Sequence, residues 1–590
     1  MDEQPQFYEV EARSVLETGI VGLDHITGGG LPRGRVISIF GAAGAGKTVL
    51  GLQILAHRVS AGERAVFISF EQTADSVLED MAGFSWGADG FAEDELIVLE
   101  TGVPTDLHVS GRFDMQGLIA TLLAVTDASG ATIVMLDGLN ALLSLLLEEA
   151  DERRELLRLT DWVRSQGLTV LITAKASAEN ERARTRAEIL DYQTDCVLVL
   201  DRLQTGNAIS RTLQVTKYRG AAHIGHIVPV VMTNNGVEVV IAGGLASETL
   251  APGAPASRPD QRMPTGVEEL DPLLGGGYLV GSRTLLSGAP GTSKSTLAAA
   301  FSLAVVQGGG RVLYVSFDEV RAQLELHTAS VGYSFREPLE SGSLRILEES
   351  ASGGTPEESA LRIIRAVDEL GANAVVIDPV SALTGSGHPF ADESLSYLLT
   401  SLSQRGVTVL LTSLLHGAAS LDEEATKSNI STIADNWIHL TYIANGGERN
   451  RALTIVKSRA TAHTNQVREL VITSEGIELR PAYVADGDVL LGSARAQKEE
   501  QDRTEAWLRA VEYERGEAEI LASMAELEGR ISGLGNEVDL RRRDLERLRT
   551  TRDGALERTA TALEARVAAR RSGNLANDGN LANDGEGAHE

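Results

Sequence analysis

The amino-acid sequence predicts an α/β protein with two tandem domains of mainly parallel sheet, followed by a C-terminal α-helical coiled coil. Three observations support this prediction: a tandem duplication, short apolar runs that alternate with longer helical patterns, and a heptad seam near the C-terminus. The chain has 590 residues, whereas single hydrophobic cores stop growing near ~250–300 residues. We therefore expect more than one domain.

The duplication is a set of similar segments that recur in the same order. Residues 18–48, TGIVGLDHITGGGLPRGRVISIFGAAGAGKT, match residues 265–295, TGVEELDPLLGGGYLVGSRTLLSGAPGTSKS. Later runs also pair, for example ATIVMLDGLNALL at 131–143 with NAVVIDPVSAL at 373–383. Their apolar stretches are continuous rather than alternating, which is typical of buried parallel strands. The pattern indicates two copies of one domain, each a mainly parallel sheet flanked by helices.

Changes in composition predict the domain boundaries. A stretch rich in Pro, Ala, Gly and Ser separates the two copies, as expected of a linker. After residue 497 the chain becomes rich in Glu, Arg, Ala and Leu. We expect a first domain at 1–245, a linker at 246–262, a second domain at 263–485, a C-terminal loop at 486–500, a coiled-coil helix at 501–571 and a disordered tail at 572–590.

Charge and composition argue against several classes of protein. The net charge of −30 counts against a protein that coats nucleic acid, because contact with phosphate backbones needs a basic surface. No apolar run reaches the ~18–20 residues of a membrane helix. The first residues, MDEQPQFYEVEARS, lack the basic-then-apolar order of a secretory signal. Cys196 is the only cysteine, so no intrachain disulfide can form, which fits a cytoplasmic protein.

Residues 41–48, GAAGAGKT, fit the phosphate-loop pattern G-x-x-x-x-G-K-[ST] between an apolar strand and a helical pattern. Glycines let backbone N–H groups surround phosphates, and the helix N-terminus adds partial positive charge. We expect Lys47 to reach the β- and γ-phosphates and Thr48 to bind Mg²⁺. The predicted ATP-binding residues here are Gly41, Gly44, Ala45, Gly46, Lys47, Thr48 and Val49.

The second phosphate loop, GAPGTSKS at 288–295, departs from the pattern because Ser293 replaces the glycine before Lys294. If that position needs a positive φ, serine carries a steric cost of roughly 1 kcal/mol. Nucleotide binding is still expected, because the lysine, the hydroxyl and the surrounding repeat are intact. The predicted ATP-binding residues are Gly288, Gly291, Thr292, Ser293, Lys294, Ser295 and Thr296, with Ser295 also a metal ligand.

Acidic residues follow the predicted strands of both copies. Asp137 and Asp378 each end an apolar strand, where a carboxylate can hold the metal through water. Glu71, and the pair Asp318 and Glu319, follow another strand, where a carboxylate beside the γ-phosphate can take a proton from water or a hydroxyl. We predict these three residues to be catalytic; the alternative is an ordinary surface role.

Basic residues alternate on one strand of each copy: Lys217 and Arg219 in the first, Lys457 and Arg459 in the second. Residues two apart on a strand face the same way. Two cations aimed at the γ-phosphate of a neighbouring subunit would act as arginine fingers. The alternative is a solvated basic edge.

These residues together resemble the KaiC family of circadian clock proteins. The resemblance covers residues 14–495 and rests on the duplicated TG-[IV]-x-x-LD opening, both phosphate loops, the acidic pair and the K-x-R…H motif. It implies two tandem RecA-like P-loop domains in a two-tiered hexamer, with ATP and Mg²⁺ at subunit interfaces. The first domain would hydrolyse ATP slowly and the second would autophosphorylate. The resemblance also adds His223 and His463 to the predicted ATP-binding residues.

The segment SNISTIADNWI, residues 428–438, is similar to the phosphorylation segment of this family. The resemblance implies that Ser431 and Thr432 are phosphoacceptors, with Thr426 a transient one, and that ATP bound to the neighbouring subunit donates the phosphate. The alternative is a hydroxyl pair that caps a turn. The chain departs from the family in its acidic pairs, which are Glu71–Gln72 and Asp318–Glu319 rather than two glutamates.

Two further segments bear on partners. HVSGRFDMQGL at 108–118 resembles the region of the first domain where KaiB docks, so we expect KaiB as a partner. LLGSARAQ at 490–497 resembles the start of the loop on which KaiA pulls, whereas the residues after 497 depart from the tail that KaiA grips. KaiA is therefore not an expected partner.

The tail carries a heptad seam, with spacings that alternate between four and three residues. Its positions are Ile520, Met524, Leu527, Ile531, Leu534, Val538, Arg541, Leu545, Leu548, Arg552 and Ala555. A coiled coil here could join two hexamers into a dodecamer or hold a partner helix. The alternative is a helix that folds back on its own domain.

Three functions remain open from the sequence. The leading hypothesis is a clock or timing protein that is both an ATPase and a serine/threonine autokinase. The second is a KaiC-like signalling ATPase without rhythmic autokinase activity. The third, a RecA- or helicase-like DNA motor, is disfavoured by the acidity of the chain.

Overall fold

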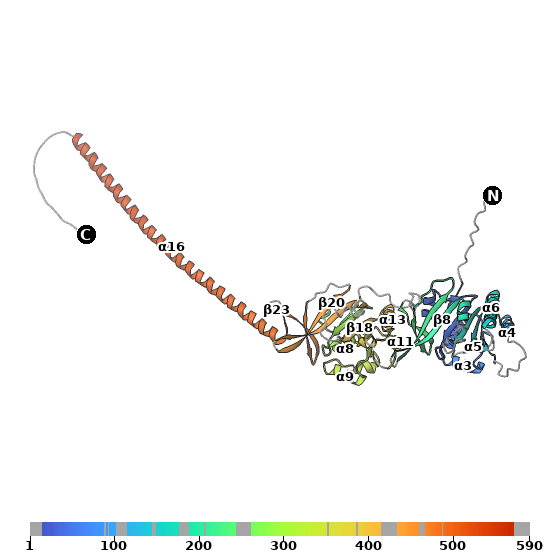
Figure 1. Ribbon diagram of the computed structural model, residues 1–590. Helices are drawn as coiled ribbons and strands as arrows, with labels where there is room; N and C mark the ends of the chain where they lie inside the picture. Colours follow the sequence, from blue (N-terminus) through green and yellow to red (C-terminus); the bar gives the residue numbers. More distant parts are fainter. Residues whose placement is uncertain are drawn as a thin grey trace, which may run out of the picture. The chain divides into compact units, whose positions relative to one another are not determined.

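The computed structural model describes residues 14–87, 90–92, 94–101, 115–143, 149–175, 188–205, 208–242, 261–350, 353–384, 387–414, 433–445, 447–459, 466–485 and 488–571. The chain divides into two compact units, Met1–Ala494 and Arg495–Glu590. The first unit contains two nine-stranded sheets, and the second consists, where described, of one helix (Figure 1). No helix within the described residues has both the length and the apolar character needed to cross a membrane.

The first sheet has the strand order β11-β10-β9-β8-β3-β7-β6-β4-β5. The strands from β5 to β8 in this order are parallel, and β8 to β11 pair antiparallel at one edge. The bounds are β3 Val36–Gly41, β4 Ala65–Ser69, β5 Leu96–Glu100, β6 Ile133–Asp137, β7 Thr169–Lys175, β8 Cys196–Thr205, β9 Ala208–Tyr218, β10 Val228–Thr233 and β11 Gly236–Val239.

The second sheet repeats this topology, with the order β16-β15-β17-β18-β14-β19-β20-β21-β22. Its bounds are β14 Arg283–Gly288, β15 Val312–Ser316, β16 Leu344–Glu348, β17 Ala374–Asp378, β18 Thr408–Leu414, β19 Asn436–Asn445, β20 Glu448–Ser458, β21 Arg468–Thr473 and β22 Gly476–Pro481. Each strand occupies the position of its counterpart in the first sheet. The predicted fold class, two tandem domains with mainly parallel sheets, is confirmed.

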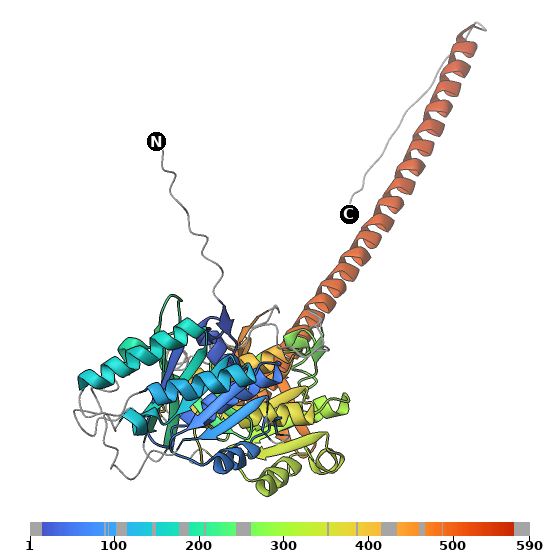
Figure 2. The same ribbon diagram turned by 90° about the vertical axis from the view of Figure 1, so that its right-hand side faces the viewer.

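Helices pack against both faces of each sheet, because each sheet contributes residues to two core clusters. Figure 2 shows helices of the first domain in front of its strands. In the first domain they are α1 Val21–Thr27, α2 Lys47–Ser60, α3 Ala74–Ala82, α4 Gln116–Ser129, α5 Leu139–Leu143 and α6 Glu149–Gln166. In the second they are α8 Lys294–Gln307, α9 Arg321–Ala329, α10 Arg336–Ser341, α11 Pro356–Leu370, α12 Ser381–Thr384 and α13 Ala391–Gln404, with a short 3₁₀ helix at Pro272–Leu274. Short strand pairs, β1 Val15–Leu16 with β2 Leu31–Pro32 and β12 Arg262–Met263 with β13 Tyr278–Leu279, precede the two sheets.

The parallel strands are buried on both faces, which is why their sequences read as continuous apolar runs. In β3, Ile37 and Ile39 belong to the cluster that contains residues of α2, whereas Val36 and Phe40 belong to the cluster on the other face. Successive side chains of a strand alternate between faces, so one run supplies both cores. The carboxyl ends of these strands lie at one edge of the sheet, where the phosphate loop begins.

The two domains contact each other through β9, β10 and β11 of the first and α11 and α13 of the second. Val231 and Val240 belong to a buried cluster with Leu361, and Tyr397 packs against it. Beside this cluster Glu238 forms an ion pair with Arg365. A buried polar group joins the same elements, since Ser210 hydrogen-bonds both Glu357 and His388; its oxygen lies 2.9 Å from Nε2 of His388.

The C-terminal helix α16 runs from Gly492 to Arg571. The long helix fits the predicted coiled coil, but it begins inside the stretch 486–500 that we expected to be a loop. That stretch holds β24 Asp488–Leu490, which pairs with β23 Tyr483–Ala485, and then the first turns of the helix. Two observations explain the early start. The run SARAQKEE is rich in strong helix formers. In addition, the N–H groups of Gly492 and Ser493 donate to the carboxylates of Glu469 and Glu448.

The apolar seam of α16 is exposed along the helix. Exposed seam residues are Ile520, Met524, Leu527, Ile531, Leu534, Val538, Leu545 and Leu548. An isolated helix of this kind leaves apolar surface in water that a partner helix would bury.

Substitution of Leu361 tests the contact between the two domains. We expect Leu361→Ala to lower the free energy of unfolding by about 2–3 kcal/mol, because the change removes a side chain that is only 4% exposed and leaves a cavity. Urea denaturation followed by circular dichroism measures the loss. Leu326→Ala is the matched control, since Leu326 is 68% exposed. Equal stability of the two variants would contradict the described contact.

Candidate functional site

The phosphate loop of the first domain connects the end of β3 at Gly41 to the first residue of α2 at Lys47. Gly44 and Gly46 have φ angles of 72° and 101°, in the left-handed region that glycine enters without steric cost. This turn leaves the first N–H groups of α2 directed at the space where an anion would bind. Nζ of Lys47 donates to the carbonyl oxygens of Gly41 at 3.0 Å and Ala42 at 2.9 Å. Burial lowers the pKa of Lys47, and a phosphate would offer it a charged partner.

The two metal ligands predicted in the first domain lie in contact. Oγ1 of Thr48 donates to both carboxylate oxygens of Asp137 at 3.1 Å. Thr173, near the end of β7, donates to Asp137 at 2.6 Å and so fixes the carboxylate. Burial raises the pKa of Asp137. A hydroxyl and a carboxylate side by side are hard oxygen ligands of the kind that Mg²⁺ prefers, so these residues fit the metal.

The second phosphate loop has the same geometry in spite of its serine. Ser293 has a φ of 80° and is the one non-glycine residue with a positive φ within the described ranges. Helix α8 begins directly after it, at Lys294. Nζ of Lys294 donates to the carbonyl oxygens of Gly288 at 2.8 Å and Ala289 at 3.0 Å, as in the first domain, and burial lowers its pKa. The fold therefore imposes the left-handed turn on a residue that carries a steric penalty for it.

A cavity of about 460 Å³ opens above the second loop. Ser295 and Asp378, the predicted metal ligands, both line it. Asp378 accepts hydrogen bonds from Thr412, the counterpart of Thr173, and from the hydroxyl of Tyr314 at 2.6 Å. The second site thus repeats the arrangement of the first: lysine, hydroxyl and a held carboxylate at the carboxyl end of the sheet.

The predicted catalytic carboxylates lie at the same edge of the sheet. Glu71 follows β4 and lies 3.5 Å from the ammonium group of Lys175 at the end of β7. In the second domain Asp318 and Glu319 line the cavity beside Lys294. Burial raises the pKa of Asp318, and the charges of Asp378 and Glu319 add to the rise. A carboxyl group with a raised pKa is a stronger base when ionised, which suits the acceptance of a proton.

The predicted cation pairs do not lie at their own phosphate loops. Lys217 pairs with Val197, near the start of β8, and β8 runs parallel to β3. The phosphate loop follows the other end of β3, and each residue of strand spans ~3.3 Å. The structure therefore separates these cations from the nucleotide site of the same domain. Lys457 is placed in the same way, opposite Trp437 near the start of β19.

These basic side chains contact backbone oxygens and carboxylates of their own chain. Lys217 and Arg219 both donate to the carbonyl of Tyr192, at 3.1 and 2.7 Å. Lys457 donates to the carbonyl of Ala434 at 2.8 Å, and Arg459 lies 3.6 Å from Asp435. Burial lowers the pKa of Lys217 and of Lys457, and the neighbouring arginine lowers each further.

The ring of His223 lies 6.4 Å from that of Tyr218, the residue between Lys217 and Arg219 in the sequence. His463 and the predicted phosphoacceptors Ser431, Thr432 and Thr426 lie outside the described residues. Of the predicted KaiB segment, only residues 115–118 are described, at the start of α4.

Several residues of these sites were not predicted from the sequence. Arg451 lines the second cavity and donates to the carbonyl of Gly291 at 3.1 Å, and Tyr442 donates to the same oxygen at 2.6 Å. Lys175 and His327 are further examples. Arg451 could have been found from the repeat, because the equivalent position of the first copy is also an arginine, Arg211. The others differ between the copies, so the repeat gave no signal.

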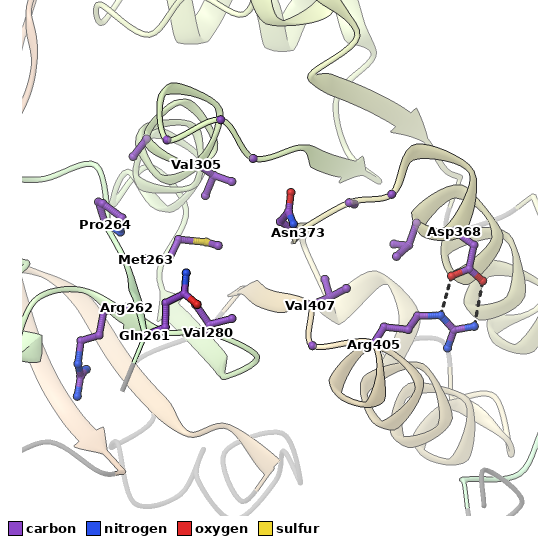
Figure 3. Close-up of a pocket in the computed structure, with 18 residues that line it drawn as sticks. Gln261, Arg262, Met263, Pro264, Val280, Val305, Asp368, Asn373, Arg405 and Val407 are labelled. Carbon is purple, nitrogen blue, oxygen red and sulfur yellow. Dashed lines mark hydrogen bonds and ion pairs between the residues drawn. The ribbon is translucent and has the colours of Figure 1, made fainter. Parts of the chain in front are cut away.

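A second cavity, of about 630 Å³, lies at the amino ends of the strands of the second domain. Figure 3 shows its lining residues, among them Met263, Asn373 and Val407. Three charged residues line it: Arg262, and Asp368 and Arg405, which are joined by two hydrogen bonds of 2.7 and 2.9 Å. This cavity is larger than the one above the second phosphate loop. Its described lining includes no part of a phosphate loop, and its one carboxylate is paired, so we do not assign the nucleotide to it.

The comparisons with known proteins agree with the geometry. The family model of the KaiC ATPase matches residues 16–243 and 263–483. The circadian clock protein KaiC2 of Synechocystis sp. is 34% identical over 484 residues, which cover 81% of this chain and 83% of that protein. KaiC3 of the same organism is 29% identical, with 82% and 95% covered. The circadian clock oscillator protein KaiC of Acaryochloris marina is 28% identical, with 80% and 90% covered.

Substitution of Ser293 tests whether its positive φ lowers the stability of the protein. We expect Ser293→Gly to raise the free energy of unfolding by about 1 kcal/mol, because glycine adopts a positive φ without the Cβ clash. The reciprocal change, Gly46→Ser, should destabilise, since its Cβ would also lie 2.6 Å from Cε of Met232. Thermal unfolding of both variants measures the two effects. A stability loss in Ser293→Gly would show that the serine side chain contributes more than its backbone costs.

Proposed function

Since the chain belongs to the KaiC family of ATPases, we propose that it binds Mg·ATP at both phosphate loops, hydrolyses ATP in the first domain and autophosphorylates Ser431 and Thr432 with the second. The observation that carries the proposal is the duplicated site: lysine over the loop, helix N-terminus, and a hydroxyl and held carboxylate at one sheet edge. When bound, Mg²⁺ neutralises charge on the phosphates.

In the first domain the proposed chemistry is the transfer of the γ-phosphoryl group to water. Lys47 would bind the β- and γ-phosphates, and Thr48 and Asp137 would hold Mg²⁺. Glu71 accepts a proton from the attacking water. Lys175, whose ammonium group lies 3.5 Å from Glu71, holds that side chain near the loop. Gln72, which stands where the family usually has a second glutamate, leaves one ionisable carboxylate at this position.

In the second domain the proposed acceptor is a hydroxyl of the protein. The hydroxyl oxygen of Ser431 or Thr432 bonds to the γ-phosphorus, the bond from phosphorus to the bridging oxygen breaks, and ADP leaves. The proton of the hydroxyl goes to Asp318, whose raised pKa suits the task. Asp318 is one carbon shorter than glutamate, and misplacement by an ångström can cost about 10²-fold in rate. We therefore expect slow transfer.

The position of the cation pairs favours action between subunits. Lys217 and Arg219, and likewise Lys457 and Arg459, lie at the strand ends remote from their own phosphate loops. They can reach a γ-phosphate only if another copy of the chain supplies it. A ring in which each subunit offers its cations to the next satisfies this requirement, and we propose a hexamer with ATP at the interfaces. His223 and His463 would join the same interface.

We propose that α16 joins two such rings through a coiled coil. Its seam residues are exposed, and a second copy of the same seam would bury them in register. The resulting particle would be a dodecamer. Arg541 and Arg552 interrupt the seam and would favour one register over others.

For partners we propose KaiB at the first domain, on the resemblance of residues 108–118. KaiA is not proposed, because the helix that begins at Gly492 replaces the tail that the resemblance would require. Nucleic acid is not proposed either, given the net charge of −30.

A second candidate function is an ATPase switch without rhythmic autokinase activity. It is favoured by the two changes confined to the second site, the strained Ser293 and the short Asp318. Both lie where phosphoryl transfer would occur, and the shorter reach of Asp318 acts against efficient transfer.

A measurement of protein phosphorylation distinguishes the autokinase from the ATPase switch. After incubation of the full chain with Mg·ATP, we expect intact mass and phosphosite mapping to find added phosphate at Ser431 or Thr432. The Ser431→Ala/Thr432→Ala variant should lose this phosphate, and any phosphate that remains should map to Thr426, the predicted transient acceptor. Continued ATP hydrolysis with no phosphate on the wild-type chain would refute the autokinase and favour the switch.

The coiled coil has its own test. Leu527→Asp/Leu534→Asp places charges in the seam, and we expect the mass measured by light scattering to fall to half. Ala522→Asp/Gly529→Asp is the control, since both residues lie midway between seam positions, on the opposite helix face. An unchanged mass in the seam variant would refute assembly through α16.

A further inference from the structure

The second nucleotide site contains a histidine that contacts Glu319, one of the two carboxylates that follow β15. His327 lies in the last turn of α9, and its Nδ1 is 3.2 Å from both carboxylate oxygens of Glu319. Both residues line the cavity that also holds Lys294 and Asp318. Ser316 fixes the backbone of Glu319, accepting from its N–H and donating to its carbonyl at 2.6 Å. Glu319 is thus held at both its backbone and its carboxylate.

The first domain has a contact at the equivalent positions, made by different chemical groups. Nε2 of Gln72 donates to Asp80 of α3 at 3.2 Å. The partners are eight residues apart in both domains, and each contact joins the residue after the acidic position to the following helix. In the first domain the helix supplies the carboxylate, and in the second it supplies the imidazole. Equivalent positions of the two copies therefore make the same contact with different chemical groups.

The surrounding charges explain why the second domain uses a histidine. At the end of β7, Lys175 stands opposite Gly41 and lies near Glu71. The counterpart at the end of β18, opposite Gly288, is Leu414. At this strand end the second site therefore has no counterpart of the lysine, although it holds two carboxylates after β15 rather than one. An untethered Glu319 would bring a further negative charge toward Asp318 and the γ-phosphate.

We propose that His327 is a positioning residue of the second site: it holds Glu319 against α9 and leaves Asp318 as the carboxylate that accepts the proton of the attacking hydroxyl. The proposal rests on the proposed function of the second domain as a site of phosphoryl transfer. Without His327, Glu319 would be free to turn toward the phosphates, oppose ATP binding and compete with Asp318. Removing the charge of Glu319 as well should then restore the site.

The test measures ADP formation at the second site of the full chain. The chain carries Glu71→Gln to suppress hydrolysis at the first site, and the rate of the same chain with Lys294→Ala is subtracted. We expect His327→Ala to lower the rate about tenfold, because the freed carboxylate of Glu319 would place a like charge beside Asp318 and the γ-phosphate. His327→Ala/Glu319→Gln should recover most of the wild-type rate. Glu325→Ala is the control for packing of α9 and should leave the rate unchanged, because the Glu325 carboxylate pairs with Arg321 on the same helix.

The outcomes of this test distinguish a failure of the proposed role of His327 from a failure of the proposed autokinase activity. Loss in His327→Ala with recovery in the double variant supports it, because a residue that merely packs α9 would not be rescued by a change in Glu319. A normal rate in His327→Ala, or no recovery in the double variant, overturns it. No ADP formation above the Lys294→Ala background overturns it together with phosphoryl transfer at the second site. ADP formation without phosphate on Ser431 or Thr432 refutes the autokinase alone, and the comparison of variants still decides the role of His327.

Discussion

The backbone turn that precedes each phosphate-loop lysine is the constraint on which both sites depend. At Gly46 and Ser293 the chain takes a φ of 101° and 80°, and a helix begins at the next residue. Only this turn directs the first N–H groups of the helix and the lysine toward one phosphate position. The serine shows how strongly the surroundings impose the turn, since the strand before it and the helix after it hold a residue that intrinsically disfavours the conformation.

Duplication preserved the scaffold and changed the charges on it. Both sheets have the same strand order, both lysines donate to two loop carbonyls, and both strand-end carboxylates are held by a threonine. The residues around the reacting group differ: Glu71 has Lys175, whereas Asp318 and Glu319 share a cavity with His327. Scaffold positions are fixed by packing and backbone geometry, while the charges at the sheet edge can change without loss of the fold.

The separation of cations from phosphates within each domain links the fold to assembly. Lys217 and Lys457 pair with residues near the starts of β8 and β19, and the phosphate loops follow the opposite ends of the strands beside them. Under the proposed arrangement between subunits, a single chain would hold two halves of different sites. The same logic applies to α16, whose apolar seam is exposed in the single chain and needs a partner for burial.

The sequence by itself determined the duplication, the parallel sheets, both phosphate loops and the carboxylates at the strand ends, because each depends on local pattern: continuous apolar runs, glycine spacing and position after a strand. It also predicted the long helix from its heptad seam, although not that Glu448 and Glu469 let it start at Gly492. Only the tertiary structure decided which residues meet across the chain. Thr173 contacts Asp137, Arg451 contacts Gly291 and His327 contacts Glu319. Sheet register and helix packing bring these residues together, and a local sequence pattern specifies neither the register nor the packing.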